Sequence, residues 1–269
     1  MLRTMLFLLV GVLSLALSSC LTIEQNITVN RDGSGVKTLT MDMGALFDNP
    51  MMQAAMESSE EVGDLRQRDS SFLLIDDMRS SNPQWTAEDI ALLERGVGRL
   101  QMDMDEQVMV MTFTMPFSNF DELAYMEKLM SEAKRPDEGN PGEGQGDADM
   151  LGMMSAFGGG LAGDTKGTTY EFKKGRLVVT TPATEGDPSD LLGMGEDAEE
   201  GMDEMLKSMM EEMMMITTYT MPGKVTKVSG LKDAITDGNT VYQEVPFETL
   251  LNDTEAYTSG QVVTIKYKK

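Results

Sequence analysis

The hexapeptide NRDGSG, residues 30–35, has the residue types of a calcium-binding loop. Asn30, Asp32, Gly33 and Ser34 fall where an EF-hand loop has its second and third oxygen ligands, its sharp-turn glycine and the next position. A complete loop also needs an acidic first residue and a bidentate glutamate at its twelfth position. Those positions are Thr28 and Leu39 here. Because both flanks alternate as strands do, we expect a hairpin turn.

The other residue types restrict catalysis and metal binding. The chain has no histidine and a single cysteine, Cys20, which removes imidazole chemistry and leaves one thiol. A GxSxG elbow does not occur. Asp103 and Asp105 have chelating side chains, but acids beside a hairpin turn are ordinary. We therefore expect no catalytic residue, no metal site and no cofactor.

Methionine supplies 27 of the 269 residues and is the chain's most distinctive side chain. In the alternating runs, methionines two positions apart should point from one face of a sheet. The candidate ligand-binding residues are Met41, Met43, Met102, Met104, Met109 and Met111.

These methionines have three interpretations. Methionine is unbranched and polarizable, so it fills irregular cores. It also lines pliable apolar pockets, and a groove for a lipid acyl chain would use it in that way. Thioethers select Cu(I) and Ag(I) as well, although such metal sites commonly add a histidine. A helix expected over residues 197–214 has methionines at helical spacing and could cover the sheet face.

The first twenty residues, MLRTMLFLLVGVLSLALSSC, have the pattern of a bacterial lipoprotein signal. A basic start at Arg3 precedes a short apolar run that ends in Leu-Ser-Ser-Cys. We expect residues 1–19 to be removed and Cys20 to carry the lipid anchor, for example palmitate. The alternative is an ordinary signal peptide or membrane anchor with an incidental cysteine. Leu21, in place of an aspartate, favours the periplasmic face of the outer membrane.

The chain is strongly acidic, with 45 acidic and 22 basic residues and a formal net charge of −23. Such a chain is repelled at long range by nucleic acid and by anionic lipid headgroups, so we expect no nucleic acid partner. Acids concentrate in residues 182–214, which are typical of a solvated and partly mobile face.

The spacing of apolar residues predicts short strands in hairpins with helices between them. Capping signals place helices from Thr86 to Leu93 and from Ser118 to about Ala133, and a helix-like segment covers residues 72–78. A short amphipathic helix is expected to begin at Asn49-Pro50. Strands are expected at 22–29, 35–43, 97–104, 107–115, 168–181 (a hairpin that turns at Lys174-Gly175), 215–223, 223–230, 240–246 and 261–268, with a helical turn at 247–251.

This order predicts an α+β fold, with one antiparallel sheet built from hairpins and helices packed on one face. Residues 20–269 would form a single domain. An acidic insertion rich in glycine and proline, at about 135–167, is expected to be flexible. Two domains divided near residue 150 are the alternative.

Both ends of the chain resemble the LppM-type domain of small bacterial lipoproteins. The resemblance is carried by the cysteine followed by a strand, the DGSG turn (Asp32 to Gly35) and a strand, and by MPGKV (221–225) with a GNTV turn (238–241). It implies an α+β lipid-associated module without catalytic residues. Members often have a C-terminal transmembrane helix, whereas this sequence ends at Lys269 with no apolar run.

The sequence therefore predicts a non-catalytic lipoprotein of the cell envelope, anchored by its N-terminal lipid. Its expected partner is an apolar ligand such as a lipid, or an envelope protein. A purely structural or interaction role is the alternative, and a methionine-rich Cu(I) or Ag(I) binder is a further one.

Overall fold

A computed structural model gives the fold of 21–48, 67–73, 75, 78–80, 82–133, 167–183, 213–252 and 260–268. Several predicted features lie outside these residues. They are the signal peptide 1–19, Cys20, a helix expected to begin at Asn49, almost all of the insertion 135–167, and residues 197–212 of the expected covering helix.

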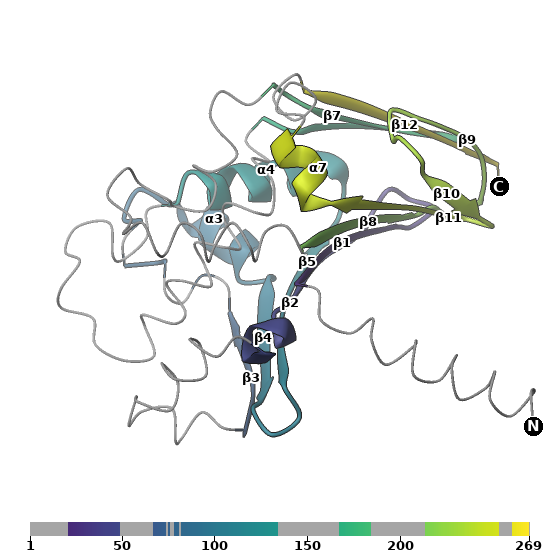
Figure 1. Cartoon of the computed structure of the whole chain (residues 1–269). Coiled ribbons are helices and arrows are strands. Elements are labelled where there is room, and N and C mark those ends of the chain that lie inside the picture. Colours follow the sequence, from purple (N-terminus) through teal and green to yellow (C-terminus); the bar gives the residue numbers. More distant parts are fainter. Residues whose placement is uncertain are drawn as a thin grey trace, which may run out of the picture.

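Eight strands form the larger of two sheets, in the order β10-β11-β8-β1-β2-β5-β4-β3 (Figure 1). Neighbouring strands are antiparallel except β1 and β8, which run parallel. The strands are β1 (Thr22–Val29), β2 (Gly35–Asp42), β3 (Gln67–Leu73), β4 (Val97–Asp103), β5 (Val108–Phe117), β8 (Met214–Thr220), β10 (Ile235–Asp237) and β11 (Thr240–Pro246).

The smaller sheet has four antiparallel strands in the order β6-β7-β12-β9. They are β6 (Thr169–Lys173), β7 (Arg176–Thr181), β9 (Lys224–Ser229) and β12 (Gln261–Lys268). This sheet packs across the side of the larger sheet that contains β1, β8 and β11 (Figure 1).

The predicted α+β class is confirmed, but the expected single continuous sheet divides in two. The division occurs between β8 and β9, where Met221-Pro222-Gly223 lies at a bend. Pro222 has no amide hydrogen to donate to a ladder, and β9 pairs with β12 instead. Strands from both sides of residue 150 nevertheless share the larger sheet, because β8 and β11 lie beside β1.

The predicted turn at residues 30–34 is confirmed. The amide of Asn30 donates to the carbonyl of Ser34 at 2.8 Å, and Gly33 has a φ of +93° that favours glycine. The Asp32 carboxylate accepts from the Ser34 amide at 3.1 Å and from its hydroxyl at 2.7 Å. The side-chain bond from Ser34 is the main reason that the pKa of Asp32 is below its ordinary value.

Two predicted helices are present, the first with its predicted capping box. Helix α3 (Ala87–Leu93) begins at a capping box between Thr86 and Asp89, and α4 (Phe120–Ser131) begins at Asn119. Helix α4 lies against β5 and β6, and α3 contacts α4. A helix α7 (Phe247–Asn252) and a 3-10 helix η1 (Gly44–Asp48) are shorter.

Two expected helical segments are wrong where the structure describes them. Phe72 belongs to β3 and lies opposite Gly98 of β4. A Cβ at position 98 would come within 2.3 Å of the Phe72 ring. Met214 is the first residue of β8, and its amide donates to the carbonyl of Leu21 at 2.9 Å. In both places, ladder pairing with a distant strand overrides the local helical spacing.

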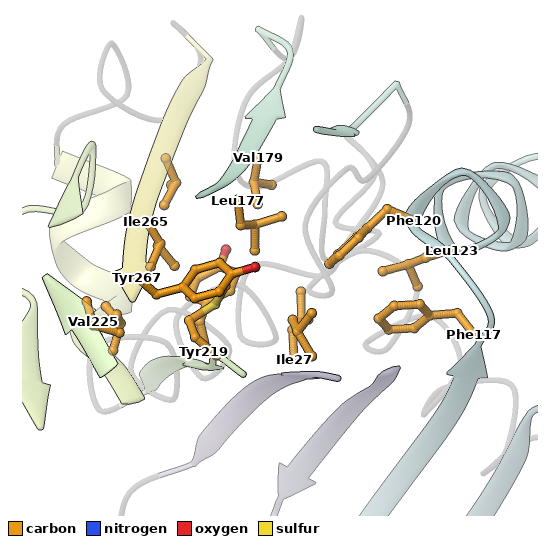
Figure 2. Close-up of a cluster of buried hydrophobic side chains, with 14 residues drawn as sticks. Ile27, Phe117, Phe120, Leu123, Leu177, Val179, Tyr219, Val225, Ile265 and Tyr267 are labelled. Carbon is orange, nitrogen blue, oxygen red and sulfur yellow. The ribbon is translucent and has the colours of Figure 1, made fainter. Parts of the chain in front are cut away.

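Two clusters of buried side chains lie along one face of the larger sheet. The first, called the methionine cluster below, contains Leu21, Ile23, Leu39, Met41, Met43, Phe47, Leu100, Met102, Met109, Met111, Met213 and Phe247. The second, called the inter-sheet core, joins the two sheets and α4 through residues such as Ile27, Phe120, Leu177, Tyr219 and Ile265 (Figure 2). A smaller group, Ile75, Trp85, Leu93 and Leu129, packs α3 on α4.

Candidate functional site

The structure brings the six candidate methionines together. Met41 lies opposite Met111, and Met102 lies opposite Met109, so three neighbouring strands contribute to one patch. Five of the six are buried with exposed fractions of 1–5%: Met41, Met43, Met102, Met109 and Met111. Met104, in the turn after β4, is partly buried against the same cluster.

Short elements cover this patch in the described part of the chain. Phe47 comes from the five-residue η1, Phe247 from the six-residue α7, and Met213 from the residue before β8. The inter-sheet core, by contrast, is covered by the twelve-residue α4 and a four-stranded sheet. Short elements with few contacts open at lower free energy than long ones. Within the described residues, the methionine cluster is therefore closed, and it has the thinner cover of the two.

The methionine cluster begins at the residue after Cys20. Leu21 is only 6% exposed, belongs to the cluster, and accepts a hydrogen bond from Met214 through its carbonyl. Cys20 itself lies outside the described residues. The predicted lipidation site is therefore joined to the apolar face of the sheet without an intervening linker.

A buried ion pair is the second notable group, and the sequence reasoning missed it. Lys37 of β2 donates to Oε1 of Glu127 in α4 at 2.6 Å, and the two side chains are 4% and 2% exposed. The hydroxyl of Tyr170 in β6 donates to the same carboxylate at 2.8 Å and 3.1 Å. These three residues connect the larger sheet, α4 and the smaller sheet.

Two buried tyrosines lie in the field of Glu127. Burial raises the pKa of Tyr170 well above its ordinary value, and the charge of Glu127 adds to the effect. Burial also raises the pKa of Tyr219, again with a contribution from Glu127. Both phenols stay protonated at neutral pH, so neither tyrosine can act as a proton acceptor. The ion pair and its tyrosine neighbours therefore connect the two sheets and α4 through hydrogen bonds and charge.

A sequence signal for Lys37 was present. Residues 35, 37, 39 and 41 alternate inward on β2, and a lysine in that row is unusual because unpaired lysines are almost never fully buried. Its partner Glu127 is 90 positions away on a helix. The inward position of Lys37 therefore predicts that a buried acidic partner exists, but does not identify which residue it is.

Of the two aspartates considered as chelators, Asp103 ends β4 and Asp105 lies in the turn that follows. Asp103 accepts from the amides of Asp105 and Glu106, both at 3.0 Å, and the bond from Glu106 is the main reason for its lowered pKa. Within the described ranges, no group of three or more acidic or cysteine residues is placed to hold a metal ion.

No family model matches the chain, and no curated protein matches it. Among solved structures, the chain is similar to the folded domain of the Mycobacterium tuberculosis LppM protein, determined by NMR. The identity is 9% and the TM-score 0.33, over 93% of this chain and 91% of that one. Among the described helices, none has the length and hydropathy needed to cross a bilayer.

Proposed function

We propose that the protein is a lipoprotein of the bacterial cell envelope that binds a lipid acyl chain at the methionine cluster. The observation that carries this proposal is the position of the cluster, which starts at Leu21, directly after the predicted lipidation residue. An N-terminal anchor would hold this face of the sheet close to a membrane and raise its effective concentration beside lipids.

The composition of the cluster supports an apolar ligand. Its twelve buried members are all methionine, leucine, isoleucine or phenylalanine, and six of them are methionine. Flexible unbranched methionines adapt to a chain that enters and then repack when it leaves. A site of this kind selects for length and apolarity and performs no reaction, which fits a chain without histidine.

Entry of a ligand requires displacement of the cover, because the cluster is filled by its own side chains. Phe47 and Phe247 are 4% and 2% exposed and lie on short helices at its border. We propose that these two elements move outward together with their phenylalanines, while the strands that bear Met41, Met102 and Met109 stay paired.

Native mass spectrometry of residues 21–269, which contain every described contact, tests the proposal. An acyl-chain mass that co-purifies and is displaced by a fluorescent fatty acid is the expected result. A folded chain that takes up no lipid and does not shift the fluorophore would overturn it, and a structural or partner-binding role in the envelope would remain.

A methionine-to-leucine pair separates acyl chains from soft metal ions. Met102→Leu with Met109→Leu keeps the volume and apolarity of the cluster, at a cost below about 1.5 kcal/mol each, but removes two thioethers. Fatty-acid uptake should persist in this variant, whereas a Cu(I) site would be lost. Met126→Leu is the matched control, since Met126 is a fully buried methionine of α4 outside the cluster.

A further inference from the structure

The outward face of the smaller sheet carries a row of basic residues across all four strands. The register pairs Lys173 with Arg176, Arg176 with Lys266, and Lys266 with Lys227. In the next row, Lys268 lies opposite Lys224. All five lysines are exposed and Arg176 is half-exposed. These six residues are called the basic face below.

The basic face reverses the charge of the chain locally. Its four strands contain six basic residues and one acidic residue, Glu171, in a chain whose formal charge is −23. Glu171 pairs with Lys173, and with Arg176 at 3.2 Å. Within the described residues, no carboxylate pairs with Lys224, Lys227, Lys266 or Lys268.

Packing does not require these charges. The opposite face of the same strands supplies Val225, Ile265 and Tyr267 to the inter-sheet core, and these are 0–6% exposed. Like charges placed directly opposite on neighbouring strands destabilise the pairing. The repulsion among Arg176, Lys266 and Lys227 therefore opposes folding, and within the described residues Lys227 and Lys266 have no carboxylate of the sheet to offset it.

We propose that the basic face binds the anionic headgroups of a lipid bilayer. A four-stranded sheet presents its charges in a broad layer that can approach a membrane surface. Each lysine or arginine near an anionic surface strengthens binding about fivefold. Val262, 56% exposed on the same face, adds an apolar side chain at the interface. This binding is independent of the acyl-chain site.

The acidity of the rest of the chain does not prevent this contact. Charges farther than a Debye length, about 8 Å at physiological ionic strength, are largely screened. At contact, the headgroups therefore sense the basic face more than any acids that lie beyond this distance. The long-range repulsion expected from the net charge is overcome locally once this face is oriented toward the surface. A lipid anchor and a basic patch together give more stable attachment than one signal alone.

Vesicle co-sedimentation of residues 21–269 tests the proposal without the anchor. The chain should bind phosphatidylcholine vesicles that contain about one third phosphatidylglycerol, bind pure phosphatidylcholine weakly or not at all, and dissociate at high salt. K227Q/K266Q should lower the partition coefficient about 25-fold. R79Q/K128Q is the matched control, because it removes two positive charges from the loop before α3 and from α4 and should change binding by less than about twofold.

Three results would overturn the proposal. The first is equal loss of binding in the two variants, which would indicate a net-charge effect. The second is a self-association, seen by sedimentation velocity and abolished by K227Q/K266Q, because the face would then bind an acidic region of a second copy. The third is a lower melting temperature of K227Q/K266Q, because removal of opposed charges should leave the fold equally or more stable.

Discussion

Lys37 on β2 and Glu127 on α4 form an ion pair 2.6 Å long that is almost completely excluded from solvent. Burial of one such charge without the other is unfavourable, since water no longer solvates the survivor. The pair therefore couples the position of α4 to the centre of the larger sheet.

Glu127→Ala should lower the free energy of unfolding by about 3–5 kcal/mol, because it leaves Lys37 charged and buried and removes the acceptor of Tyr170. Lys37→Met combined with Glu127→Leu should recover most of that loss. Urea unfolding measures both. As a control, Arg99→Ala breaks an exposed pair with Asp69 and should cost less than about 1 kcal/mol.

Alkaline pH should destabilise the fold through Tyr170 and Tyr219. Their pKa values are raised in the folded state, so the unfolded chain loses these protons first, near pH 10. The stabilisation is complete below about pH 10 and falls above it by about 1.4 kcal/mol per pH unit for each tyrosine. Urea unfolding between about pH 9 and pH 11 should show a smaller decrease for Tyr170→Phe than for the parent chain. Identical slopes would contradict this assignment.

Two glycines should respond differently to alanine. At Gly35, a Cβ would lie 2.2 Å from the Thr28 carbonyl oxygen and 2.5 Å from the Phe117 ring, so Gly35→Ala should disrupt the β1–β2 hairpin. Gly238 has a φ of +58° with open space around it, and Gly238→Ala should cost only about 1–2 kcal/mol of backbone strain. Thermal unfolding followed by circular dichroism measures the difference, and equal melting temperatures would refute it.

Cys20→Ala should release the protein from membranes. The expectation follows from the Leu-Ser-Ser-Cys sequence that ends the apolar run. Fractionation in high salt removes any electrostatic attachment, and a detergent partition then reports the lipid anchor alone. If the variant remains in the membrane fraction and keeps residues 1–19, lipidation at Cys20 is wrong.

The sequence was most informative where structure is decided locally. Turns at Gly33 and Gly175 and the capping box at Thr86 depend on neighbouring residues, and all three are present. The alternation that places Met41, Met109 and Met111 inward is also a local pattern.

Features that depend on contacts between distant residues could not be predicted from local sequence patterns. The pairing of Lys37 with Glu127, the parallel neighbours β1 and β8, and the change of sheet after Met221 join segments far apart in the chain. Period-2 patterns specify which side chains point inward but not which strand lies alongside. The basic row likewise appears only when four strand registers are known.

The parallel pairing of β1 with β8 has a consequence for how the chain acquires its structure. Ile23 pairs with Met215, about 190 positions later, whereas Ile23 and Met41 close a short hairpin. Local hairpins form in microseconds, but contacts between distant segments must first overcome loop-closure entropy and form slowly. The β1–β2 hairpin can therefore form early, while one edge of β1 stays unpaired until residues 214–220 emerge. During that interval, the exposed edge is a site for chaperone binding or aggregation.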